Sequence, residues 1–190
     1  MLLALGQLQL DTDARTAVIG LVDSLDRGCI EAVASGADAV WLRCGATVAQ
    51  VSEAAERGGR PVGITVDDLV RSAELVAAGA VAVEVRAVDV DVAEMAAARE
   101  LSFWCRPDVA HRALEAGVTP DRLIVEGAAW TGAGVIGRTI GGEGTSAWGA
   151  VVRAVHDGVG AVRATDTRAV RRVVTVADRL MAAQPAGGAR

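Results

Sequence analysis

The stretch ASGADAVWLR at residues 34–43 returns as AAGAVAVEVR at residues 77–86, and a looser copy, HDGVGAVRAT, spans residues 156–165. In each copy an alanine-rich run ends at a glycine, which stops a helix readily because it adopts the left-handed conformation without a Cβ clash. The apolar run that follows is typical of a parallel strand buried on both faces. A charged residue stands where that strand should end. The repeated unit therefore predicts a protein built from β/α repeats.

The pattern extends to eight strands separated by helices over most of the chain. The expected strands are residues 17–23, 39–43, 62–66, 81–86, 101–106, 123–126, 135–140 and 161–165. The expected helices are residues 26–35, 47–57, 67–78, 90–99, 107–116, 145–157 and 167–183. Such alternation indicates parallel βα units, and eight strands favour a closed (β/α)8 TIM-like barrel. We expect residues 1–10 to form a short strand or a plug under this barrel.

One connection in the series is too short. Only residues 127–134, GAAWTGAG, separate the sixth and seventh strands, whereas a parallel crossover needs about a dozen residues, usually a helix. Either the helix between these strands is missing or one strand is misplaced, and the shortened barrel should be hardest to close here. We expect a single domain over residues 1–184, followed by a disordered tail over residues 185–190.

The composition excludes several classes of function. All 19 basic residues are arginine, so the chain offers neither a Schiff-base lysine nor a P-loop lysine. A net charge of −5 disfavours nucleic acid as a partner, and no apolar run is long enough for a membrane span. Both histidines fall in expected helices, so we expect no bound metal and no cofactor. Three scattered cysteines indicate the reducing cytoplasm rather than a disulfide framework.

Charged residues gather where the expected strands end, which is the face of a β/α barrel that carries function. They are Asp23, Arg43, Asp67, Glu84, Arg86, Arg106, Glu126, Arg138, Arg163 and Asp166. Two interpretations stay open. The arginines are suited to binding a carboxylate or phosphate through paired hydrogen bonds, or the two signs neutralise one another in a network that caps the barrel. Trp41, Trp104 and Trp130 also lie near strand ends, where an indole either stacks on a flat heterocycle or packs in the core.

Three of these strand ends carry recognisable motifs. Residues 19–23 read IGLVD, residues 64–68 read ITVDD, and residues 161–166 read AVRATD. They resemble the strand ends GIVN, ISVDT and VRVHD of the dihydropteroate synthase family, the pterin-binding TIM barrels. The resemblance covers most of the chain. It implies a transferase-type barrel related to folate biosynthesis.

The resemblance also implies roles for individual residues. Asp67 matches the family's aspartate that contacts the pterin, and Arg163 matches an arginine of its anion site. Thr165 stands where the family has the histidine of that anion site, and Asp23 stands where it has an asparagine. These four positions are therefore candidate ligand-binding residues.

Other positions depart from the family. Its long first loop is reduced to SLDRG at residues 24–28, and Glu84 replaces an Asn-Asp pair. Glu126 stands where the family has Asp-Pro-Gly, without the lysine that follows there. Arg138 is kept from the family's Ser-Arg-Lys, but Thr139 replaces the lysine. We count Glu84, Glu126 and Arg138 as candidate ligand-binding residues, assign no catalytic residue, and expect no dihydropteroate synthase activity, because such sites depend steeply on single charges.

Three hypotheses about function follow. The chain is a degenerate pterin-barrel homologue that binds a pterin-like or anionic small molecule at most; or it is an active transferase of the same superfamily on a pterin-like, folate-like or phosphorylated substrate; or it is a non-catalytic interaction protein. A hydrophobic content of 52% supports self-association. We expect a homodimer near the sixth strand and the last two helices, because the missing helix should leave the outer face of the sixth and seventh strands uncovered, residues 123–126 among them. The apolar stripe that includes Trp148 and Val152 should contribute to it.

Overall fold

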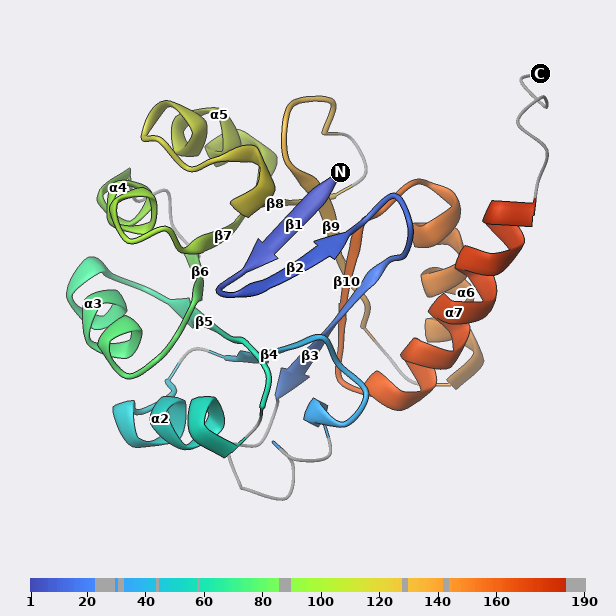
Figure 1. The fold of residues 1–190 in the computed structure, drawn as a ribbon, viewed down its shortest axis with the longest axis horizontal. Coiled ribbons are helices and arrows are strands. Elements are labelled where there is room, and N and C mark those ends of the chain that lie inside the picture. Colours follow the sequence, from blue (N-terminus) through green and yellow to red (C-terminus); the bar gives the residue numbers. More distant parts are fainter. Residues whose placement is uncertain are drawn as a thin grey trace.

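The computed structural model of the chain describes residues 1–22, 30, 33–43, 45–57, 59–85, 90–127, 130–141 and 144–183. Eight parallel strands close into one barrel in the order β10-β3-β4-β5-β6-β7-β8-β9 (Figure 1). The strands are β3 (Ala17–Val22), β4 (Ala39–Leu42), β5 (Val62–Val66), β6 (Ala82–Val85), β7 (Ser102–Cys105), β8 (Leu123–Glu126), β9 (Val135–Thr139) and β10 (Ala161–Ala164). The (β/α)8 TIM-like barrel expected from the sequence is confirmed.

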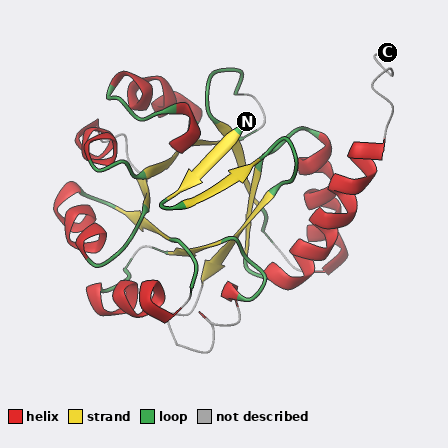
Figure 2. Ribbon diagram, in the orientation of Figure 1, coloured by secondary structure: helices red, strands yellow, loops and turns green. Residues whose placement is uncertain are grey.

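Helices surround the barrel, as Figure 2 shows. They are α2 (Val48–Arg57), α3 (Leu69–Ala77), α4 (Val90–Ala98), α5 (Pro107–Glu115), the short η1 (Pro120–Arg122), α6 (Gly144–His156) and α7 (Thr167–Ala183). Of the helix expected at residues 26–35, residues 30 and 33–35 are described; residues 30, 33 and 34 are helical, and residue 35 lies in a turn. None of the described helices has the length and apolar character needed to span a membrane.

The glycines of the repeated motif do not all serve the same purpose. Gly79 and Gly158 have φ angles of 110° and 80°, so they end their helices in the left-handed conformation, as expected. Gly36 does not adopt a positive φ. A Cβ at Gly36 would lie 2.7 Å from the backbone carbon of Thr167, so this glycine is required by the close approach of α7.

The first residues form a plug, as expected. The strands β1 (Leu2–Leu5) and β2 (Leu8–Asp11) pair as an antiparallel hairpin that lies across one end of the barrel (Figure 1). Leu3, Leu5 and Leu10 are buried in one cluster with the inward-facing side chains of the barrel. Ser102 donates a hydrogen bond to the carbonyl of Ala4, which ties the hairpin to β7. The hairpin therefore closes the amino end of the barrel.

Two tryptophans fill the barrel interior. Trp41 and Trp104 are fully buried, and their rings meet edge to face with centroids 5.6 Å apart. Glycines on other strands make room for them. A Cβ at Gly63 would lie 2.2 Å from the ring of Trp41, and a Cβ at Gly137 would lie 2.7 Å from the ring of Trp104. The barrel is thus packed as a solid core in which indole rings are matched by glycines.

The barrel closes across the short connection. β8 and β9 pair in parallel, so the strands were placed correctly and the crossover helix is missing: none of the described residues 127 and 130–134 is helical. The ring of Trp130 lies 4.9 Å from that of His111 on α5, and Trp130 belongs to the same buried cluster as Leu123 and Val125. Both of these β8 residues are fully buried. The expectation of an uncovered outer face on β8 is therefore wrong, because Trp130 and α5 cover it.

Candidate functional site

The carboxyl end of the barrel holds a buried ion pair between two strands on opposite sides of the barrel, β6 and β10. Arg163 on β10 donates two hydrogen bonds to the carboxylate of Glu84 on β6, at 2.7 and 3.0 Å. The two side chains are only 9% and 20% exposed. Both residues alternate inward along their strands, and barrel closure makes them face each other although they are 79 residues apart. This two-pronged geometry is the strongest that an arginine and a carboxylate form.

A second acidic residue joins this pair through a threonine. The Oγ1 of Thr139 accepts hydrogen bonds from Nε and Nη2 of Arg163, at 3.1 and 3.0 Å. The backbone N–H of Thr139 donates to Glu126 at 2.7 Å, and its hydroxyl lies 3.3 Å from the other oxygen of that carboxylate. Glu126 is thereby held in place on the neighbouring strand β8.

The two indoles complete the arrangement. Trp104 donates from Nε1 to Glu126 at 2.7 Å. Trp41 donates to the hydroxyl of Thr65 at 3.1 Å, and that hydroxyl donates to Glu84 at 2.8 Å. The guanidinium carbon of Arg163 lies 4.3 Å from the ring centroid of Trp104 and 5.3 Å from that of Trp41, within the range of cation–π attraction.

We call these residues the barrel network: Trp41, Thr65, Glu84, Trp104, Glu126, Thr139 and Arg163. Each ionisable member hydrogen-bonds to another member. The network has one guanidinium and two carboxylates, so its formal charge is negative. An anion placed against Arg163 would have to displace Glu84 and would face Glu126. The neutralising interpretation of the charged residues therefore describes this part of the barrel better than an open anion site does.

The structure brings together three of the seven candidate ligand-binding residues. Glu84, Glu126 and Arg163 meet in the barrel network. Arg138 alternates outward on β9, and its guanidinium lies 3.8 Å from Asp157 at the end of α6. The structure thus places Arg138 away from the other three.

The remaining candidates lie at the strand ends. Asp67 is exposed directly after β5, and Thr165 is half-buried directly after β10. The next residue after Thr165, Asp166, accepts a hydrogen bond from the backbone of Ala169 at 3.1 Å and thereby supports the start of α7. Asp23 lies outside the described residues.

Sequence reasoning missed the two threonines of the barrel network as members of the site. Thr65 lies two residues before Asp67, and Thr139 lies two residues after Gly137. Side chains of a strand alternate between its faces, so counting in steps of two from the inward positions would have found both. The strand-end residues were identified by their charge, and a threonine hydroxyl carries no charge.

Among the described residues, Cys105 near this site is unsuited to nucleophilic chemistry. Cys105 is buried at the end of β7. Burial, reinforced by the negative charges of Asp108 and Glu84, raises the pKa of its thiol to about 12. A thiol with such a pKa stays protonated at neutral pH, and the thiolate is the reactive form.

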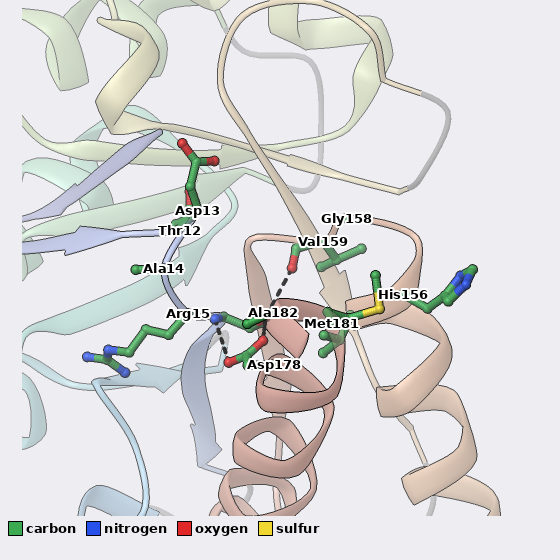
Figure 3. Close-up of a pocket in the computed structure, with 12 residues that line it drawn as sticks. Thr12, Asp13, Ala14, Arg15, His156, Gly158, Val159, Asp178, Met181 and Ala182 are labelled. Atoms are coloured by element: carbon green, nitrogen blue, oxygen red, sulfur yellow. Dashed lines mark hydrogen bonds between the residues drawn. The ribbon is translucent and has the colours of Figure 1, made fainter. Parts of the chain in front are cut away.

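A cavity of about 370 Å³ lies at the other end of the barrel, between the β2–β3 connection and the last turns of α6 and α7. Figure 3 shows Asp178 turned toward the β2–β3 connection, while the side chains of Arg15 and His156 extend away in opposite directions. Asp178 accepts hydrogen bonds from the backbone N–H and the hydroxyl of Thr16, at 3.0 and 2.8 Å. This carboxylate therefore anchors α7 to the start of β3.

Comparison with solved structures identifies the fold. The dihydropteroate synthase of Yersinia pestis superposes with a TM-score of 0.79 at 15% identity, covering 96% of this chain and 99% of that one. The Coxiella burnetii enzyme in complex with pteroic acid gives 0.80 at 14% identity, with 96% and 99% covered. The Thermus thermophilus enzyme in complex with 4-aminobenzoate gives 0.77 at 19% identity, with 95% and 99% covered.

At the level of sequence, no protein-family model and no curated relative matches this chain. The resemblance noted at the strand ends is thus matched in three dimensions, across nearly the whole molecule. Identities below 20% establish the architecture and leave the chemistry to the residues of the site. The chain has the fold of the dihydropteroate synthases, with a charged network closed on itself inside the barrel.

Proposed function

We propose that this protein is a dihydropteroate-synthase-like barrel that does not synthesise dihydropteroate. The observation that supports this most directly is the engagement of Arg163, whose guanidinium bonds Glu84 and Thr139 and lies against two indoles. Releasing it for an anion would leave Glu84 buried without its partner, which typically costs about 3–5 kcal/mol. The lysines that the family has after strands six and seven are also replaced.

The test is a turnover assay. The purified protein is incubated with pterin diphosphate, p-aminobenzoate and magnesium, and product is followed by chromatography. We expect no turnover above background. Turnover at an ordinary enzymatic rate of about 1 s⁻¹ or more would refute the proposal and favour an active transferase.

We further propose that the edge of the barrel at Asp67 binds a pterin-like heterocycle. Asp67 is exposed at the end of β5, outside the barrel network, and a carboxylate can accept paired hydrogen bonds from the N–H groups of such a ring. Quenching of pterin fluorescence measures the binding. Asp67→Asn should abolish it, whereas Glu94→Gln, an exposed control on α4, should leave it unchanged. Equal binding by both variants would contradict this site.

Self-association is the second candidate function, and one surface favours it. Trp148 and Val152 on α6 are 42% and 48% exposed, and Val176 and Leu180 on α7 are more exposed still. These side chains border a groove of about 390 Å³ between the two helices. We propose that a second copy of the chain covers this α6–α7 face through a two-fold symmetric contact, the commonest arrangement of dimers.

Sedimentation measures the oligomeric state directly. The wild type should behave as a dimer of the 19.4 kDa chain, and changing Trp148 and Val152 to glutamate should give a folded monomer. A wild type that stays at 19.4 kDa up to high concentration would refute the dimer.

The buried free thiol of Cys105 suits a reducing compartment, and we propose the cytoplasm as the location.

A further inference from the structure

A second polar cavity, of about 320 Å³, lies where β3 and β4 begin, beside α7. We call it the arginine cavity. Its walls are the side chains of Arg15, Asp38, Arg60, Arg171 and Thr175, together with the loop at residues 35–37. These parts come from four separate segments of the chain. Arg60 precedes β5, whereas Asp67 follows it, so this cavity and the proposed heterocycle site lie at opposite ends of that strand.

The single carboxylate among the described residues of this cavity, Asp38, is already bonded by two of its arginines. Asp38 accepts two hydrogen bonds from Arg15, at 3.1 and 3.0 Å, another from Arg171, and one from the backbone N–H of Val18 at 2.8 Å. Three of these four donors bond Oδ2 and one bonds Oδ1. Two guanidiniums thus share one negative charge, which leaves a formal surplus of one positive charge.

Further guanidiniums add to the surplus. Arg60 is exposed and makes no hydrogen bond or ion pair with any residue that the structure describes. Arg168 donates from Nε to the hydroxyl of Ser35, on the cavity wall, at 2.9 Å. On α7 the next acidic residue, Asp178, is turned to Thr16 instead. Three arginines therefore line the cavity with one carboxylate, and a fourth contacts its wall.

Fold stability does not account for this concentration of positive charge. The triad of Arg15, Asp38 and Arg171 already joins β3, β4 and α7, and Arg60 contributes nothing to it. Like charges gathered on one side of a protein repel each other, and an exposed guanidinium with free donors is suited to a doubly charged oxyanion. We propose that the arginine cavity binds the phosphoryl group of a small soluble molecule, with Arg60 as its principal contact.

Inorganic diphosphate is the probe, titrated calorimetrically at constant ionic strength, with acetate as a singly charged control. The wild type should bind diphosphate at one saturable site. Because a hydrogen bond to a charged group contributes about 1.5 kcal/mol or more, Arg60→Ala should weaken binding by about tenfold. Arg60→Glu should abolish it. Arg112→Ala on α5 removes an exposed arginine that has no side-chain partner among the described residues, and it should bind as the wild type does.

Three results would contradict the proposal. If diphosphate binding is unchanged in Arg60→Ala, the anion binds elsewhere and the proposal is wrong. The absence of saturable heat in the wild type, or equal weakening in Arg60→Ala and Arg112→Ala, would likewise overturn it. Thermal unfolding followed by circular dichroism checks that each variant is folded. Because the two sites respond to different substitutions, failure of this proposal leaves the proposed heterocycle site untouched.

Discussion

The barrel network should contribute more to stability than to binding, and Arg163→Met tests this directly. Methionine keeps the length of the side chain but removes two hydrogen bonds to Glu84 and two to Thr139. Removing one partner of a buried pair costs about 3–5 kcal/mol, and we take the lower end because Glu84 is 20% exposed. Loss of the cation–π contact with Trp104 adds about 1 kcal/mol. The expected loss is therefore about 4 kcal/mol.

A double-mutant cycle isolates the pair. Glu84→Leu alone leaves Arg163 buried without a carboxylate and should cost a similar amount. The double variant, Arg163→Met with Glu84→Leu, leaves neither charge and should cost about 2 kcal/mol less than the sum of the two single changes. Urea unfolding followed by circular dichroism at pH 7 gives all four free energies of unfolding.

The cycle also separates the two interpretations of Arg163. Replacing an arginine that has a structural role lowers the free energy of unfolding strongly, as calculated above. Replacing an arginine that serves only to bind an anion lowers the free energy of unfolding little. A loss below about 1 kcal/mol for Arg163→Met, or additive single changes, would refute the reasoning from the barrel network.

Four further predictions concern packing, charge and reactivity. Gly63→Ala should destabilise by about 1–3 kcal/mol because its Cβ overlaps a core indole, whereas Gly149→Ala, within α6 and with nothing near its Cβ, should stabilise by about 1 kcal/mol. Burial alone would raise the pKa of Asp38, but hydrogen bonds from two arginines and a backbone N–H hold it below its ordinary value. The stability that the ionised Asp38 contributes should therefore be complete above about pH 5 and be lost as the pH falls through the lowered pKa. Cys105 should react with a thiol reagent only after unfolding. Trp130→Ala should cost about 3–5 kcal/mol because it removes a buried side chain that packs with Leu123 and Val125 on the outer face of β8.

Each of these four predictions has a measurement that can contradict it. Chemical unfolding measures the glycine and tryptophan variants, and equal effects at Gly63 and Gly149 would contradict the packing argument. Asp38→Asn should flatten the acid side of the stability curve; an unchanged slope would mean that other carboxylates govern it. Rapid labelling of Cys105 in the native protein would contradict its burial.

Much of the candidate site was predictable in position but not in its bonding. Strand ends followed from periodicity, so Glu84, Glu126 and Arg163 were identified as residues of the carboxyl end. Their partners did not follow, because Glu84 and Arg163 are separated by 79 residues and meet only when the barrel closes. Arg138 was grouped with them by its place in the sequence, yet it alternates to the outer side of β9 and approaches Asp157.

The sequence by itself determined the barrel and the short connection between its sixth and seventh strands. These depend on local chemistry: glycine ends a helix, apolar runs of four to six residues form buried strands, and eight residues are too few for a helical crossover. Tertiary structure alone decided three other matters. It placed Trp130 over the outer face of β8, paired Arg163 with Glu84, and gathered three arginines in one cavity with Asp38. In the last two cases the residues come from distant segments, and their contact energies exist only once the chain is closed around its core.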